Sequence, residues 1–287
     1  MHYQSLQEMP TTWRCGRFLF DFSKRKRPIV MGILNATPDS FFDGGKFRSA
    51  KDAIAQAELM IENGVDLIDI GGESTRPGAE PVELQEELDR VLPVIEALKD
   101  CGVPLSIDTY KADTMRQALH AGVDCVNDIW ALRQAGALEA VMGSHHCGIV
   151  LMHMQRDPLT MQFNPEYQDV IAEVKQFLNH RAKLLISKGI SSDRIAIDPG
   201  FGFGKSLEHN LNMLAHFADF SALGLPVLAG ISRKSMIGKI TGKDTNERVA
   251  PSIAAAIMAA DRGAQIVRVH DVPETVDALK LWEAINT

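Results

Sequence analysis

Seven polar side chains lie at or near the C-terminal ends of short apolar runs that predict strands. They are Asn35, Asp108, Asn127, Asp198, Lys234, Arg268 and His270. The two amides and two carboxylates offer acceptor oxygens, and those of Asp108, Asn127 and Asp198 suit a flat ligand edge rich in N–H donors, such as a 2-amino-pyrimidinone. The others, with Arg76 and Arg233, are cationic or donor groups that suit phosphate or diphosphate. The sequence predicts a ligand that is donor-rich at one end and anionic at the other.

A single Asp or Asn at a strand end is as often a helix cap as a ligand-binding residue, so the interpretation depends on the whole set. His153 also follows an apolar run, and its role is left open: it either reaches the mouth of the barrel or is structural. The adjacent pair His145 and His146 has no partner at metal-ligand spacing and is interpreted as a solvated loop.

The segment 198–206, DPGFGFGKS, nearly spells a phosphate-binding P-loop. Residues 204–206 fit, but Pro199 stands where the first glycine belongs, and proline has a fixed φ and no N–H to offer a phosphate. The segment is therefore interpreted as a loop whose glycines let the backbone turn tightly beside a ligand. Lys205 is interpreted as a surface lysine and is given no role.

Eight short, β-branched apolar runs must position these side chains. They are residues 29–34, 65–70, 103–107, 123–126, 148–152, 194–197, 226–231 and 265–269, and segments with helical spacing separate them. Strands apolar along their whole length are covered on both faces, which favours a parallel sheet. Eight such units predict an α/β fold of the TIM (β/α)8 barrel type, whose active sites lie at the C-terminal ends of the strands. A doubly wound open sheet is the alternative, but its Gly-x-Gly-x-x-Gly turn is missing after the first run.

No linker-like composition divides the chain, so residues 28–287 are predicted to form one barrel. Residues 1–27 form an N-terminal extension, with a short hairpin over the bottom of the barrel. Within it, the basic run 24–27 is interpreted as a solvated chain entry. Two long loops, 37–49 and 71–81, hold eight glycines and prolines, which suits lids that close over a reactive intermediate.

Composition excludes several classes of protein. The 287 residues carry a net charge of −7, which argues against a nucleic-acid surface. No segment approaches the roughly 18 apolar residues of a membrane span. The four cysteines are far apart, with no pair at zinc or redox spacing, so we expect free thiols and a cytoplasmic location.

At its motifs the sequence resembles the dihydropteroate synthase family of folate biosynthesis, the target of sulfonamides. The family's two signatures are matched by residues 31–45, MGILNATPDSFFDGG, and residues 69–78, DIGGESTRPG. Further matches lie at 106–109, 127–129, 151–154, 198–205, 232–235 and 268–271. Together they cover residues 28–285, essentially the whole predicted barrel.

The resemblance implies a transferase in which p-aminobenzoate attacks the methylene carbon of 6-hydroxymethyl-7,8-dihydropterin diphosphate. It implies that the pterin is held by Asp108, Asn127, Asp198 and Lys234, and the diphosphate by Asn35, Arg76, Arg268 and His270. It also implies Mg²⁺ bound through Asn35 and a homodimer packed through the last helices. The p-aminobenzoate site would be bordered by Phe41, Thr75, Pro77, Phe203, Ser232 and Arg233.

No nucleophilic side chain is needed for this chemistry, because the methylene carbon can ionise if the departing diphosphate is stabilised. Three other functions remain open at this point. A corrinoid-linked methyltransferase would not need Arg76, Arg268 and His270. A sugar-phosphate isomerase or aldolase would need a catalytic carboxylate or a Schiff-base lysine, for which Lys234 is the obvious candidate. A non-catalytic binding protein would bind the ligand without turnover.

Overall fold

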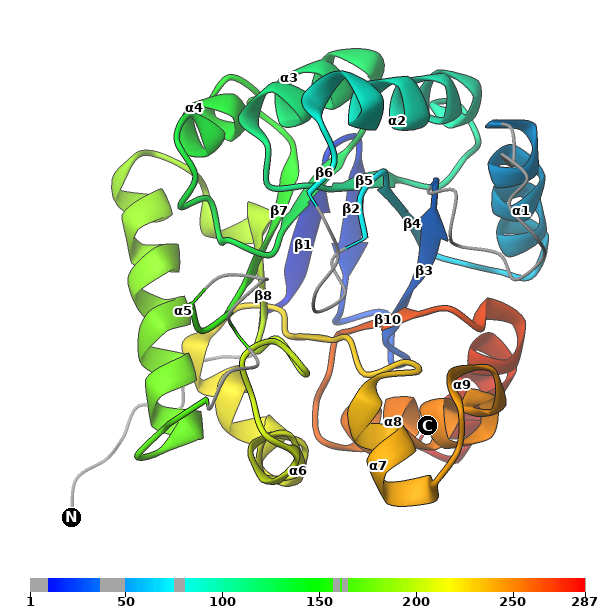
Figure 1. Cartoon of the computed structure of the whole chain (residues 1–287), viewed down its shortest axis with the longest axis vertical. Helices are drawn as coiled ribbons and strands as arrows, with labels where there is room; N and C mark the ends of the chain where they lie inside the picture. Colours follow the sequence, from blue (N-terminus) through cyan, green and yellow to red (C-terminus); the bar gives the residue numbers. More distant parts are fainter. Residues whose placement is uncertain (1–9, 37–49, 75–80, 157–160, 162–164, 287) are drawn as a thin grey trace.

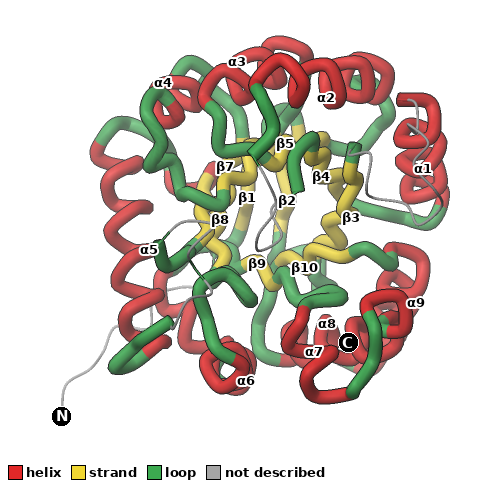
Figure 2. The backbone as a smooth tube through the Cα atoms, viewed as in Figure 1, coloured by secondary structure: helices red, strands yellow, loops and turns green. Residues whose placement is uncertain are grey.

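The computed structural model describes residues 10–36, 50–74, 81–156, 161 and 165–286. Eight parallel strands form one sheet in the order β8-β7-β6-β5-β4-β3-β10-β9. A parallel bridge between Ile197 and Val227 joins the two ends of this order, so the sheet curls into a nearly closed barrel. Figure 2 shows the ring of strands with helices around it. The predicted TIM barrel is confirmed.

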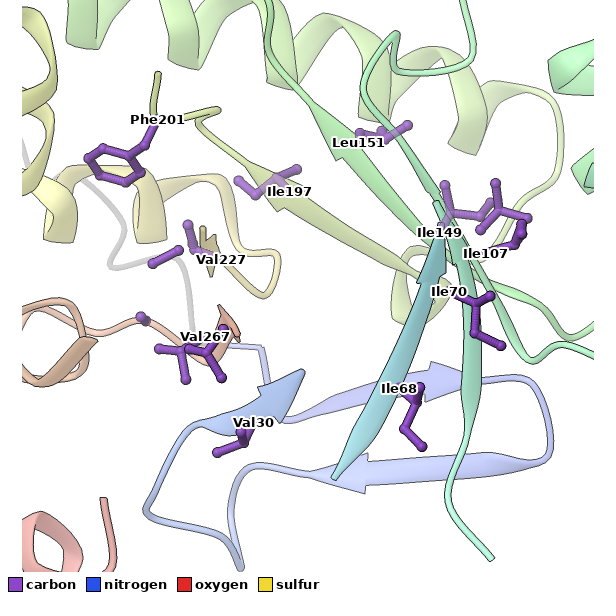
Figure 3. Close-up of a cluster of buried hydrophobic side chains, with 14 of the residues drawn as sticks. Val30, Ile68, Ile70, Ile107, Ile149, Leu151, Ile197, Phe201, Val227 and Val267 are labelled. Atoms are coloured by element: carbon purple, nitrogen blue, oxygen red, sulfur yellow. The ribbon is translucent and has the colours of Figure 1, made fainter. Parts of the chain in front are cut away.

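The barrel strands coincide with the eight predicted runs. They are β3 (Ile29–Asn35), β4 (Leu67–Gly71), β5 (Leu105–Asp108), β6 (Cys125–Asp128), β7 (Gly148–Met152), β8 (Ile195–Asp198), β9 (Leu228–Ala229) and β10 (Ile266–Val269). Their side chains alternate between the two faces of the sheet. On the outer face, Ile68, Ile70, Ile107, Ile149 and Leu151 belong to one large apolar cluster (Figure 3).

Helices cover this outer face (Figure 1). They are α1 (Ala50–Glu62), α2 (Leu84–Leu98), α3 (Ala112–Ala121), α4 (Ala137–Met142), α5 (Val170–Ser187), α6 (Leu207–Ala215), α7 (Ser235–Thr241), α8 (Val249–Asp261) and α9 (Val272–Ile285). Short 3-10 turns lie at Ser192–Arg194, Phe217–Leu223 and Thr245–Glu247. In α2, the buried residues Leu88, Val91 and Ile95 recur at helical spacing and form its inward stripe.

The bottom of the barrel is filled by apolar side chains. Its cluster comprises Ile29, Met31, Leu67, Cys125, Val150, Ala196, Leu228 and Ile266, with Trp13 and Cys15 below them. These last two come from an antiparallel hairpin, β1 (Thr12–Cys15) and β2 (Phe18–Asp21). The indole N–H of Trp13 donates to the carbonyl of Arg194 at 3.2 Å, which ties the hairpin to the barrel. The predicted hairpin is confirmed, and its tryptophan closes the lower end of the core.

The basic run 24–27 is only partly the solvated entry that we predicted. Lys24 and Lys26 are exposed, but Arg25 and Arg27 turn inward and pair with Asp66. The same carboxylate accepts the backbone N–H of Val30 at 2.9 Å. The run therefore fixes where the chain enters the first barrel strand, because a half-buried carboxylate needs such partners.

Two predictions from composition concern the cysteines and the membrane spans. The four cysteines are free thiols, as predicted, and three of them are buried. Among the described helices, none has both the length and the apolar character required to cross a membrane.

Candidate active site

A polar layer lies above the apolar bottom of the barrel. Because every second residue of a strand points to the same face, Asp69 stands one step above the buried Leu67. The same two-residue step leads from Cys125 to Asn127, from Ala196 to Asp198 and from Ile266 to Arg268. The carboxyl ends of the strands thus carry the polar groups that the sequence predicted for the mouth, and these groups belong to one ring.

Arg268 is the centre of this ring. Its Nε lies 2.6 Å from Oδ2 of Asp69, and its Nη2 lies 2.6 Å from Oδ2 of Asp108. Asn127 donates its amide Nδ2 to the same Oδ2 of Asp69 at 2.9 Å. The structure therefore joins two residues predicted for the pterin, Asp108 and Asn127, to one predicted for the diphosphate. Asp69, which bonds to both Arg268 and Asn127, was not among the predicted site residues.

Several oxygens of this ring are buried without a hydrogen-bond partner in the described part of the chain. They are Oδ1 of Asp69, Oδ1 of Asp108 and Oγ of Ser106. Buried polar atoms in folded proteins are almost always paired, so the unpaired Oδ1 of Asp108, at the end of β5, suits a ligand that brings donors. Burial raises the pKa of Asp108 to about 7; the Arg268 guanidinium opposes this rise and the Asp69 carboxylate adds to it.

Asp198 and Lys234 form a second group on the opposite strands, β8 and the end of the β9 segment. Oδ1 of Asp198 accepts the backbone N–H of Gly200 at 2.7 Å, which is a local turn; the following helix α6 is capped by Ser206, so Asp198 is not its cap. Lys234 donates to the carbonyl of Phe201, and its Nζ lies 4.6 Å from the ring centre of Phe203. Burial raises the pKa of Asp198, and Lys234 opposes that rise. Burial lowers the pKa of Lys234 to about 8, against the pull of Asp198.

The glycines of the segment 198–206 serve close packing. Gly200 has a φ of 73°, and a Cβ there would lie 2.0 Å from the carbonyl oxygen of His153. Gly204 has a φ of 62°, and its Cβ would lie 2.8 Å from the Cβ of Gln155. Only glycine fits such positions. The segment therefore folds against the end of β7, and no P-loop is needed to explain it.

Lys205 is not the surface residue that we predicted. It is 3% exposed, and its Nζ lies 2.9 Å from Nδ1 of His153, 2.9 Å from the carbonyl oxygen of Gly200 and 3.0 Å from that of Phe203. The charged end of the side chain is thus directed inward, where it joins the glycine segment to the end of β7. For His153 the structural alternative holds, because its ring is buried against Lys205 and Phe177. Burial, reinforced by Lys205, lowers the pKa of His153 to about 2.

Three more of the predicted site residues come from the loop after β9 and from the end of β10. Oγ of Ser232 lies 3.0 Å from Nδ1 of His270 and accepts the backbone N–H of His270 at 3.2 Å. Ser232 therefore fixes the imidazole at the end of β10. Arg233 instead pairs with Asp271, with Nε 3.0 Å from Oδ2. Arg233 has a φ of 56°, and a positive φ is rare for a non-glycine residue.

Asn35 ends β3, beside Gly71 of β4, and its Oδ1 would lie 3.8 Å from a Cβ at Gly71. The described residues include no group of three His, Cys, Asp or Glu side chains that could hold a metal. Mg²⁺, however, keeps several waters and binds through one or two protein oxygens plus substrate phosphates, so the amide oxygen of one asparagine together with phosphate oxygens would fit it. The predicted residues Phe41, Thr75, Arg76 and Pro77 lie outside the described residues.

Comparison with known proteins agrees with this arrangement. The family model described as "Pterin binding enzyme" matches residues 31–270. A dihydropteroate synthase of Neisseria meningitidis is 49% identical over 278 residues, which are 96% of this chain and 97% of that protein. A Burkholderia cenocepacia dihydropteroate synthase, solved with 7,8-dihydropteroate, is 51% identical, with a TM-score of 0.88 and coverage of 97% and 98%.

A second solved structure of a relative holds a different ligand. It is the dihydropteroate synthase of Xanthomonas albilineans with 4-aminobenzoic acid, 48% identical, with a TM-score of 0.90 and coverage of 97% of this chain and 99% of that one. Matches of this identity and coverage include both the apolar bottom of the barrel and its polar mouth. The chain therefore belongs to the pterin-binding enzymes and, among them, to the dihydropteroate synthase family.

Proposed function

We propose that the polar mouth of the barrel binds 6-hydroxymethyl-7,8-dihydropterin diphosphate and p-aminobenzoate, and joins them to 7,8-dihydropteroate with release of diphosphate. The observation that carries this proposal is the pairing of buried acceptors with partly buried cations at one mouth. Asp108, Asn127 and Asp198 are 5 to 6% exposed, and Arg268 bonds directly to one of them. Dihydropteroate synthase relatives that match nearly the full chain support the same reaction.

The acceptors receive the pterin ring. A 2-amino-pyrimidinone edge presents adjacent N–H donors, and the oxygens of Asp108, Asn127 and Asp198 are their complement. Lys234, which already lies over Phe203, borders the ring on the side of β9. A pocket lined with carboxylates also favours a delocalised cation, so it stabilises positive charge that develops on the ring as the methylene carbon loses its leaving group.

The donors receive the diphosphate. Arg268 and His270 at the end of β10, with Arg76 and Asn35, are assigned to the departing anion. Asn35 would hold Mg²⁺ together with the phosphate oxygens, and the bound ion would neutralise part of the charge on the leaving group. With the leaving group stabilised, the carbon–oxygen bond breaks without a protein nucleophile, and the amine of p-aminobenzoate captures the carbon.

The p-aminobenzoate is assigned to the side of the mouth formed by Phe203, Ser232 and Arg233, with Phe41, Thr75 and Pro77 from the first two loops. Phe203 supplies an aromatic face next to the Lys234 ammonium. Ser232 is tied to His270, so this side adjoins the position given to the diphosphate. Such an arrangement puts the amine beside the carbon that the diphosphate leaves.

Three broader assignments belong to the same proposal. Residues 28–287 form the barrel domain and residues 1–27 its extension, and the chain acts in the cytoplasm. It forms a homodimer through α7, α8 and α9, where Ile240, Met258 and Leu281 are about half exposed or more. Light scattering after gel filtration tests the dimer, and Met258→Glu with Leu281→Glu should yield monomers.

A diphosphate-release assay tests the reaction. The purified chain receives the pterin diphosphate with and without p-aminobenzoate and Mg²⁺, and both diphosphate and 7,8-dihydropteroate are measured. We expect equal amounts of the two products, and only when all three components are present. Methyl transfer from methyltetrahydrofolate, borohydride trapping on Lys234, or binding without turnover would each favour one of the other functions instead.

A further inference from the structure

Asp69 is assigned to neither substrate, although it bonds to two residues of the proposed machinery, Arg268 and Asn127. It lies in the middle of β4, is fully buried, and stands level with Ser106 of the neighbouring strand. Its Oδ2 receives two donors, Nε of Arg268 at 2.6 Å and Nδ2 of Asn127 at 2.9 Å. A buried carboxylate is costly unless it is paired in this way, so its place inside an otherwise apolar strand requires an explanation.

The first consequence concerns Asn127. A carboxylate carries no proton, so the amide of Asn127 must present its NH₂ group to Asp69. The amide oxygen of Asn127 is then the atom that it can offer to a ligand. Asp69 thereby makes Asn127 an acceptor, which is the chemistry that a donor-rich ring edge requires.

The second consequence concerns Arg268, whose guanidinium is shared between two carboxylates. Nε bonds to Asp69, while Nη2 bonds to Asp108. In the proposed function, however, Asp108 accepts from the pterin and Arg268 donates to the diphosphate. Asp108 can accept from the ring through Oδ1, which has no hydrogen-bond partner among the described residues, while its Oδ2 keeps Nη2. A guanidinium with five N–H donors can turn others to the phosphate, provided that the bonds to the two carboxylates hold it in place.

We propose that Asp69 is a positioning residue, which holds Arg268 through Nε beside Asp108 and fixes the amide orientation of Asn127. This inference rests on the proposed function. Asp69 itself stays beneath the ligand and touches neither substrate.

Steady-state kinetics of Asp69→Asn test the proposal, because asparagine keeps the shape of the side chain and removes its charge. We expect kcat/KM for the pterin diphosphate to fall about 100-fold, as is typical when reacting groups are misplaced by an ångström. The KM for p-aminobenzoate should change less than about threefold, since neither bonded partner is assigned to that site. A matched control is Asp124→Asn, which removes a buried carboxylate paired with Arg17 at the opposite end of the barrel, with Oδ1 2.9 Å from Nε.

A mutant cycle separates positioning from a merely structural role. In a chain that already carries Arg268→Ala and Asn127→Ala, Asp69→Asn has no partner through which to act, so its further cost should be under about threefold. Unchanged kcat/KM in the single variant, equal losses in both backgrounds, or an equal loss in Asp124→Asn would each overturn the inference. Circular dichroism of every variant verifies folding.

A second measurement needs no variant. A crystal structure of the wild-type chain with the pterin diphosphate should place the ring on Asp108 and keep Nε of Arg268 within hydrogen-bond distance of Asp69. If Arg268 leaves Asp69 when the ligand binds, the inference is wrong even if Asp69→Asn fails to fold. If the wild-type chain forms no 7,8-dihydropteroate, the proposed function is refuted instead, so the two failures are distinguishable.

Discussion

Replacing Lys205 by methionine should destabilise the fold and disturb the site together. Methionine matches the length of the lysine stem and leaves little cavity, so the change isolates the ammonium group. The ammonium serves three acceptors within 3.0 Å, namely Nδ1 of His153 and the carbonyl oxygens of Gly200 and Phe203. Burial lowers the pKa of Lys205 well below its usual range. The Asp198 carboxylate opposes that shift. An ammonium can donate to all three acceptors, whereas a neutral amine cannot.

The magnitude follows from the acceptors that lose their donor. Each orphaned buried acceptor costs about 1–3 kcal/mol. We take the low end, because losing the ammonium also removes its desolvation cost, and expect about 3 kcal/mol in all. For a chain of this size, that lowers the Tm by roughly 5 °C.

Thermal unfolding followed by circular dichroism measures this loss. Lys183→Met, at an exposed lysine of α5, serves as the control and should change stability by less than about 0.5 kcal/mol. If Lys205→Met melts within about 2 °C of the wild type, the ammonium does not hold the segment together, and the argument from its three bonds is refuted. In the surviving folded fraction, the KM for p-aminobenzoate should rise, because the Phe203 carbonyl loses its tether.

Three further predictions concern catalysis. Asp198→Asn should cost about 2–4 kcal/mol in kcat/KM for the pterin diphosphate, because an amide presents its own donor to a donor-rich ring edge. The pH profile of kcat/KM should be bell-shaped, rising as Asp108 ionises near its pKa of about 7 and falling as Lys234 loses its proton near about 8. An ¹⁸O label in the bridging position should leave wholly with the diphosphate, and Arg268→Ala should slow turnover without redirecting the label. An unchanged kcat/KM in Asp198→Asn, a flat profile between pH 6 and 9, or label recovered on the hydroxymethyl-pterin would contradict these in turn.

The fold could be predicted because its signal is repeated eight times. An apolar run such as 148–152 must be covered on both faces, and eight such runs with intervening helices leave few arrangements other than a barrel. The strand ends then follow from the two-residue alternation, which puts Asn127 above Cys125 and Arg268 above Ile266. The pairing of Arg25 and Arg27 with Asp66 could not be predicted in this way. It depends on where the chain that enters β3 meets the residue before the neighbouring strand β4.

Asp69 and Lys205 were missed for a common physical reason. The local sequence offers neither residue a partner, because Asp69 lies in an apolar strand and Lys205 in a glycine-rich loop. Their partners lie far along the chain: Arg268 is 199 residues from Asp69, and His153 is 52 residues from Lys205. A usable signal nevertheless exists for Asp69. A charge inside a strand that must be buried on both faces requires a buried counter-charge, and Arg268, also inside a strand and on the same face by alternation, is the matching group in the sequence.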